Sequence, residues 1–317
     1  SARESPSRTT GPSIFTVSES NGIIVSMKER RARWGDRREG RLLRNLHPLE
    51  AVAPFLMANR NGATNLFRDR VEIRAVERYA RAKRDEGLAG FSLLHVLLAA
   101  YVRTVSQRPG INRFVSGQRI YARSSIVVNM VARKEMTLEG ESAVVKAEFS
   151  PTDAAADVYR RFSQACEAAL AEEGNGTEAA AFATARAPRL VKKFAIWLVR
   201  VLDYFGLLPA SLIRISPFHA SMFITSMGSL GVPPVFHHLY DVGNVPVFVS
   251  FGAKYAEVEL DRDGAPTRRR YVDFTVSADE RICDGFYFAS ALRMFLGYLK
   301  DPTVLDRAPE AVVRDVD

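Results

Sequence analysis

The stretch Ser277 to Phe286, SADERICDGF, decides the fold of this 317-residue chain. The residues that lead into it, RRRYVDFTVSADE, alternate apolar and polar side chains and predict a β-strand ending near Glu280. The residues that follow, FYFASALRMFLGYLKDP, have apolar side chains at helical spacing and predict an amphipathic helix ending near Pro302. The short turn between strand and helix therefore carries the acidic residues Glu280 and Asp284.

Strand-like and helix-like segments alternate over most of the chain. Helical spacing marks AVERYARAKRDEG, FSLLHVLLAAYVRTVSQRPG and the alanine-rich segment from Asp153 to Glu172. Strand patterns mark FVSGQRIYAR, SIVVNMVARK, AVVKAEF, HASMFITSMGSLG and PVFVSFGAKYAEVEL. We find no internal repeat and no low-complexity linker, so residues 46–317 are expected to form a single α/β domain. His95 lies among leucines and is expected to be a core histidine.

Residues 1–45 form a basic arm, and the whole chain has a formal charge of +8. This charge suits an anionic partner such as nucleic acid, phospholipid or the phosphates of coenzyme A. The basic stretch Met27 to Arg44 has no aromatic residue except Trp34 and includes three acidic residues. It therefore predicts an exposed or subunit-wrapping arm, and no nucleic acid partner is expected.

The two cysteines, Cys166 and Cys283, lack metal-ligand spacing and are expected to be reduced thiols of a cytoplasmic protein. No signal-peptide pattern and no run of about 18 apolar residues is present. The segment Arg186 to Phe205 predicts a basic amphipathic helix with a wide apolar face. Two hypotheses follow: the face contacts a membrane surface, or it is buried against the core or a neighbouring subunit. The pattern favours burial.

The spacing Glu280-x-x-x-Asp284-Gly285 resembles the His-x-x-x-Asp-Gly signature of chloramphenicol acetyltransferases and of the catalytic cores of 2-oxoacid dehydrogenase (dihydrolipoamide) acyltransferases. Three more blocks resemble this family in the same order, and they are PGINRF (109–114), FITSMGSLG (223–231) and VPVFVSFGAK (245–254). A group of bacterial relatives is similar in both GLLP (206–209) and DERICDGF (279–286). The glutamate in the histidine position is therefore expected to be a feature of that group.

The resemblance implies a chloramphenicol acetyltransferase-like two-layer sandwich with a mixed sheet, assembled as a homotrimer with active sites between subunits. It also implies an acyl-coenzyme A thioester as donor. The lipoyl and subunit-binding domains of the dehydrogenase enzymes have no counterpart in the sequence, so no covalent lipoyl group is expected.

The resemblance places Glu280 as the general base and Thr225 as the hydroxyl donor to the oxyanion. Asp284 takes the place of a carboxylate that holds the loop through an arginine. An open alternative is a structural Glu280 paired with Arg281. The resemblance also implies a channel for substrate and coenzyme A, lined by Ser226, Gly228, Gly231 and Phe286.

Three histidines near the Thr225 block, His219, His237 and His238, are candidate substitute bases. Adjacent histidines can belong to a metal site, but no carboxylate or cysteine completes a ligand set around this pair. No metal is therefore expected.

Two functions remain open from the sequence. The first is a coenzyme A-dependent acyltransferase acting on a small hydroxyl, amine or thiol acceptor. The second is a catalytically inactive trimeric binding or assembly module, associated with a membrane through the Arg186 to Phe205 helix. An open channel that reaches Glu280 and Thr225 would favour the enzyme.

Overall fold

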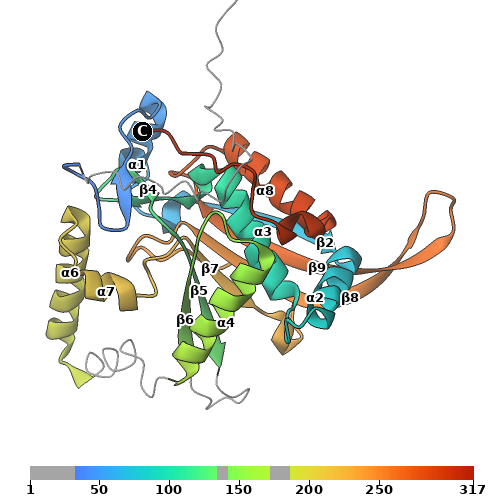
Figure 1. Ribbon diagram of the computed structural model, residues 1–317. Helices are drawn as coiled ribbons and strands as arrows, with labels where there is room; N and C mark the ends of the chain where they lie inside the picture. The colour runs from blue at the N-terminus through green and yellow to red at the C-terminus, as the bar shows by residue number, and fades with distance from the viewer. Residues whose placement is uncertain (1–32, 134–141, 172–185) are drawn as a thin grey trace, which may run out of the picture.

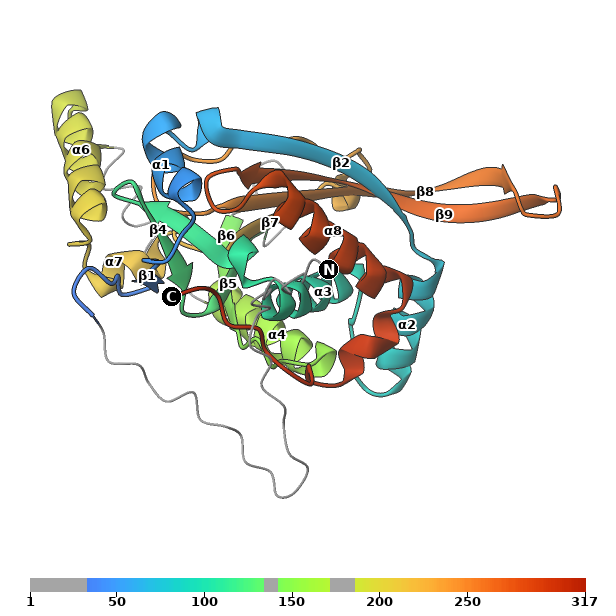
Figure 2. The same ribbon diagram turned by 90° about the horizontal axis from the view of Figure 1, so that it is seen from above.

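The computed structural model describes residues 33–133, 142–171 and 186–317 (Figure 1). Most of the predicted N-terminal arm lies outside these residues. The described end of the arm contains β1 (Gly40–Leu42), which pairs with β4 (Arg119–Arg123). With β3 (Arg113–Ser116) they form a three-stranded antiparallel sheet in the order β1-β4-β3. Beside it lies the short helix α1 (Pro48–Leu56) (Figure 2).

The predicted mixed sheet forms the centre of the molecule, and it has six strands. Its order is β2-β9-β8-β7-β5-β6, where β7 is parallel to both β5 and β8 and the other pairs are antiparallel. The strand bounds are β2 (Thr64–Glu72), β5 (Ile126–Arg133), β6 (Ser142–Phe149), β7 (Met222–Ser226), β8 (Val247–Leu260) and β9 (Pro266–Asp279).

Helices cover one face of this sheet (Figure 2). They are α2 (Arg74–Asp85), α3 (Leu93–Gln107), α4 (Ala155–Ala171) and α8 (Gly285–Lys300). The main hydrophobic core lies between these helices and the sheet, and α3 is buried along most of its length. Burial of this apolar surface is the main stabilising term. The arrangement is the predicted two-layer α/β sandwich.

His95 on α3 is a core histidine, as expected. Its Nδ1 lies 3.0 Å from the Ser92 hydroxyl and accepts the Ser92 backbone N–H at 3.1 Å, which forms a capping box at the start of the helix. Its ring packs among Phe91, Tyr159 and Phe162. Burial lowers the pKa of His95 to about 4, so the ring is neutral at pH 7.

The remaining elements are short or peripheral. The 3₁₀ turns are at Asn61–Ala63, Pro109–Asn112, Gly228–Leu230 and Pro302–Asp306. The outer half of the β8–β9 hairpin extends beyond the body of the molecule (Figure 2). At its tip, Asp261 Oδ1 accepts the backbone N–H groups of Asp263 and Ala265, which stabilises the predicted turn.

The basic amphipathic segment forms α6 (Arg189–Phe205), followed by α7 (Ala210–Ile215). Gly206, in the left-handed region at φ 74°, ends α6. The predicted burial of the apolar face of α6 against the core is wrong, whereas its burial against a neighbouring subunit stays a prediction. Trp197 is 55% exposed and Phe205 is 66% exposed, because α6 lies at the periphery, away from the central sheet (Figure 1).

Candidate functional site

Glu280 lies in the turn directly after β9. Its backbone N–H donates to the carbonyl of Ala63 at 2.9 Å, which fixes the main chain at this point. Its side chain is exposed, and among the described residues its carboxylate makes no hydrogen bond or ion pair. The carboxylate is therefore available to a substrate or to a second protein chain.

The acidic group that is paired in this turn is the neighbour, Asp279. Arg281 donates from Nε to Asp279 Oδ1 and from Nη2 to Oδ2, both at 2.8 Å. The hypothesis that Arg281 pairs with Glu280 is therefore wrong. The reason is strand alternation, since Asp279 points inward at the end of β9 and Glu280 points to solvent.

Arg60 completes this buried cluster from the other side. Its Nε lies 3.4 Å from Asp279 Oδ2, and Nη1 donates to the Tyr240 carbonyl at 2.5 Å. Burial lowers the pKa of Arg60, an effect that the Asp279 charge opposes. The cluster joins the turn at residues 279–285, called the signature turn below, to the segments that contain Arg60 and Tyr240. Sequence reasoning missed it because Arg60 is distant along the chain from this turn.

Asp284 has a local role. Its Oδ1 accepts the backbone N–H of Tyr287 at 2.7 Å, which makes it the N-cap of α8. Among the described residues it pairs with no arginine, so the expected arginine-held loop carboxylate is wrong for Asp284 within one chain. The preceding Cys283 is buried, and burial raises the pKa of its thiol to about 12, so the sulfur is not a thiolate near neutral pH.

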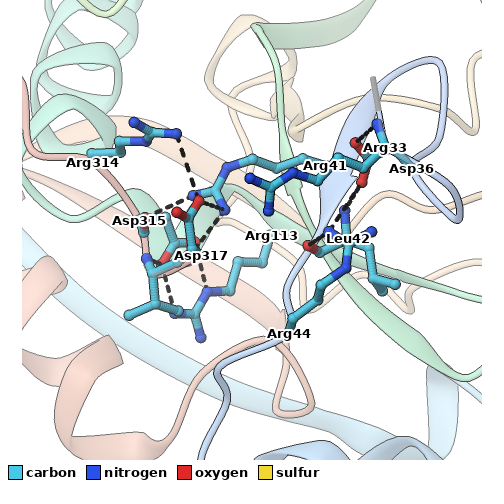
Figure 3. Close-up of polar contacts among 10 residues, drawn as sticks. Arg33, Asp36, Arg41, Leu42, Arg44, Arg113, Arg314, Asp315 and Asp317 are labelled. Atoms are coloured by element: carbon cyan, nitrogen blue, oxygen red, sulfur yellow. Dashed lines mark hydrogen bonds and ion pairs between the residues drawn. The ribbon is translucent and has the colours of Figure 1, made fainter. Parts of the chain in front are cut away.

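Arg113 supports the signature turn from the Pro109–Phe114 block. It donates to the Ile282 carbonyl at 3.2 Å and forms a two-point ion pair with Asp315 at 2.8 and 2.6 Å (Figure 3). Burial alone would lower the pKa of Arg113, but its hydrogen bonds to Asp315 raise it. Arg41 in β1 binds the same segment, donating to the Asp315 carbonyl at 2.7 Å. Through Arg113 the turn is thus tied to β3 and to the segment that contains Asp315.

Thr225 lies half-buried near the end of β7, two strands away from β9. It is level with Ser250 in β8 and Thr275 in β9, so the three hydroxyl-bearing residues share the sheet face opposite the helices. The loop after β7 crosses this face. The Val235 carbonyl accepts from Thr275 Oγ1 at 2.6 Å, and the Val235 N–H donates to Ser250 Oγ at 3.3 Å.

The predicted channel residues fall into two groups. Ser226, Gly228 and Gly231 lie with Thr225 at the end of β7, whereas Phe286 is exposed beside the signature turn. A Cβ at Gly228 would lie 2.6 Å from the Gly252 carbonyl oxygen, so this close approach of two backbones requires glycine.

One chain does not bring Glu280 and Thr225 together. Thr225 is level with Thr275 two strands away, and Glu280 lies five residues beyond Thr275. At about 3.3 Å per residue and about 4.8 Å per strand, their backbones are roughly 19 Å apart. A site that uses both residues therefore requires two copies of the chain.

The three candidate histidines lie in different settings. The His237 ring stacks on Phe248 with centroids 4.0 Å apart, and Phe248 stacks in turn on Phe223, which shares the Thr225 face of β7. His219 is buried and its Nδ1 lies 2.8 Å from the Ser216 hydroxyl, just after α7. His238 is exposed. Of the three, His237 is the one placed over the face that carries Thr225.

We describe two of the hollows formed by the described residues of the single chain. One, of about 160 Å³, is lined by α2 residues together with Lys254 and Arg270. The other, of about 60 Å³, lies in the core between the sheet and helices α3 and α8. Neither is lined by Glu280 or Thr225. Within the same described ranges, no group of three or more histidine, cysteine, aspartate or glutamate side chains is arranged to hold a metal.

No family model matches the chain, and no curated protein matches it in sequence. Solved structures do match in shape. A probable dihydrolipoamide acetyltransferase from Listeria monocytogenes superposes with a TM-score of 0.51 at 12% identity, over 80% of this chain and 92% of that one. The cubic core of a pyruvate dehydrogenase multienzyme complex gives 0.50 at 14% identity, over 91% and 99%.

A chloramphenicol acetyltransferase gives a lower TM-score of 0.44 at 14% identity, over 80% of this chain and 96% of that one. The first two similarities extend over most of the length of both partners, and they agree with the mixed sheet covered on one face by helices. The chain therefore has the fold of the dihydrolipoamide acyltransferase catalytic cores.

Proposed function

We propose that this protein transfers an acyl group from a coenzyme A thioester to a small hydroxyl, amine or thiol acceptor, at a site shared between two subunits of a homotrimer. The observation that carries the proposal is the signature turn. It presents the exposed carboxylate of Glu280 on a backbone fixed by the buried Arg60, Asp279 and Arg281 cluster. A catalytic group on a fixed backbone loses little orientational freedom when substrate binds.

Each residue has a defined part in the proposed reaction. The acceptor's proton passes to the Glu280 carboxylate while the acceptor attacks the thioester carbonyl. Thr225 Oγ1, from the neighbouring subunit, donates to the oxyanion that forms. Collapse of this intermediate breaks the carbon–sulfur bond, and the proton on Glu280 moves to the departing coenzyme A thiolate. The separation of about 19 Å within one chain supports the shared site.

His237 is the alternative base within the same proposal. Its ring lies on the Thr225 face of the sheet in the same chain, so a pair made by His237 and Thr225 needs no second subunit. A neutral imidazole is a suitable base near pH 7.

The second candidate function is a trimeric binding or assembly module without catalysis. The observation that favours it is the position of the family's histidine, which Glu280 occupies here as an exposed side chain. In this case the signature turn would be an interface element, and acyl-coenzyme A would not bind.

Calorimetric titration with acetyl-coenzyme A, combined with sedimentation, tests the proposal. We expect a stable trimer at micromolar concentration that binds the thioester. Binding should also raise the unfolding temperature, because the ligand binds the native state alone. A trimer without detectable binding would favour the module. A monomer would overturn both the shared site and the module.

A further inference from the structure

The outward surface of α6 is a continuous apolar strip. Its members are spaced by four, three and eight residues, which places them on one side of a helix. Leu190 is 79% exposed, Phe194 59%, Trp197 55% and Phe205 66%. Large apolar side chains gathered on one exposed face mark an interaction surface, unlike single exposed leucines elsewhere.

Cationic side chains border this strip. Arg189, Lys193 and Arg200 are exposed and follow one another at spacings of four and seven residues, so they form a line along α6. Trp197 lies four residues after Lys193 and forms the edge of the apolar strip that borders the cationic line. The helix therefore presents an apolar side, a tryptophan at the boundary and a positive edge.

The body of the protein holds this helix firmly at one end. Arg37 donates to the carbonyls of Asp203 and Tyr204 at 3.0 and 2.6 Å, and the Tyr204 hydroxyl donates to Gln118 at 2.9 Å. Lys146 then fixes the following helix, α7, by donating to the Ile213 carbonyl at 2.8 Å. These contacts hold α6 at the edge of the molecule (Figures 1 and 2), where the side chains of its strip are exposed.

We propose that α6 docks in the surface of an anionic lipid bilayer, with its apolar strip among the acyl chains and its cationic edge among lipid phosphates. A bilayer surface supplies both an apolar phase for the strip and negative charge for the cationic edge. Pairing of two α6 helices from two copies would instead bring the like charges of Lys193 and Arg200 together. The proposal does not depend on the acyltransferase reaction.

A bilayer is also consistent with the length of the helix. Among the described residues no helix is long and apolar enough to cross a membrane, so α6 is suited to lie in the interface plane. Its 17 residues extend about 25 Å along that plane.

Flotation of the whole chain with vesicles tests the proposal. We expect binding to an equal mixture of phosphatidylcholine and phosphatidylserine, weakened by salt, and much weaker binding to phosphatidylcholine alone. The double variant Phe194→Ser/Trp197→Ser should lose flotation, and retained flotation would overturn the proposal. The matched control, Val258→Ser/Leu260→Ser, removes two comparably exposed apolar side chains from the β8–β9 hairpin and should float like the original protein.

Charge-reversal variants test the electrostatic contribution to vesicle binding. Lys193→Glu/Arg200→Glu should lower vesicle affinity at least about tenfold, since each cation near an anionic surface contributes about a fivefold factor. Arg262→Glu/Arg268→Glu makes the same change in net charge on the exposed hairpin and should have a small effect. Equal losses in the two variants would mean that net charge alone drives binding, which overturns the role of α6.

Tryptophan fluorescence reports on α6 directly. The chain has two tryptophans, so Trp34→Phe leaves Trp197 as the single reporter, and anionic vesicles should shift its emission to the blue. The proposal is overturned if vesicles cause no shift. It is also overturned if the emission is already blue without lipid and shifts to the red on dilution, which would show that a second copy covers the strip.

Discussion

The signature turn and α6 use similar residues in opposite ways. In the turn, two arginines and a carboxylate are withdrawn from water and form ion pairs, while Glu280 faces the solvent. In α6, cations and aromatic side chains both face outward, and the described contacts with the body are concentrated at its C-terminal end. Buried charge pairs fix a geometry, whereas exposed apolar and cationic groups are available to a partner. The first region is thus suited to orientation and the second to attachment.

The largest expected effect comes from breaking the buried ion-pair cluster of the signature turn. Asp279→Ala leaves Arg60 and Arg281 buried without their counter-charge, which should cost about 3–5 kcal/mol of unfolding free energy. Urea denaturation followed by circular dichroism measures it. Asp263→Ala, at the exposed hairpin tip, is the control and should change stability by less than about 0.5 kcal/mol. A cost below about 1 kcal/mol for Asp279→Ala would mean that the cluster does not hold the turn.

Glu280 should show the reverse behaviour, with a large effect on rate and a small one on stability. Glu280→Gln keeps the size of the side chain and removes the base, so turnover of acyl-coenzyme A should fall by about 10²–10⁴ while thioester binding is retained. Glu280→His restores the residue type of the resembled signature and should retain or raise activity. If Glu280→Gln turns over as fast as the original protein, His237→Gln becomes the decisive variant.

Thr225 should contribute less than the base. Thr225→Val preserves shape and removes the hydroxyl, so we expect kcat to fall by about 10² with little change in KM. Steady-state kinetics measures both. As a control for the sheet face, Ser250→Ala removes a neighbouring hydroxyl that accepts from the Val235 N–H. An equal loss in kcat for both variants would indicate a structural effect and count against the oxyanion role.

The smallest expected effect on stability concerns α6, the exposed region of this comparison. Because the apolar strip of α6 is exposed, Phe194→Ser/Trp197→Ser should change the free energy of unfolding by less than about 0.5 kcal/mol. Denaturation of a dilute sample measures it. A loss of about 2 kcal/mol or more, on the order expected for burying such side chains, would place the strip inside a folded assembly.

Sequence periodicity predicted individual strands and helices, and the family resemblance implied the two-layer sandwich with a mixed sheet. Alternation in the residues before Glu280 predicted β9 and its end, and helical spacing after Gly285 predicted α8, because each pattern reflects one buried face. The Listeria monocytogenes structure shares the fold that the resemblance implied.

Contacts between residues that are distant along the chain could not be predicted from the sequence. Arg281 pairs with Asp279 and not with the adjacent Glu280, because strand alternation turns one carboxylate inward. The second cation, Arg60, comes from a segment more than two hundred residues earlier. Periodicity likewise identified which side of α6 is apolar, but the surface that covers a helix depends on the rest of the fold, and here the core does not reach it.

The pairing of β2 with β9 has a consequence for how the chain is made. Thr64 at the start of β2 lies opposite Asp279 at the end of β9, so this pair joins distant parts of the chain. By contrast, the paired strands β5 and β6 are neighbours along the chain. At synthesis rates of about 5–20 residues per second, β2 waits roughly 10 to 40 seconds on the ribosome before its partner exists. The neighbourhood of Glu280, whose backbone is tied to Ala63, is therefore among the last parts of the protein to take shape.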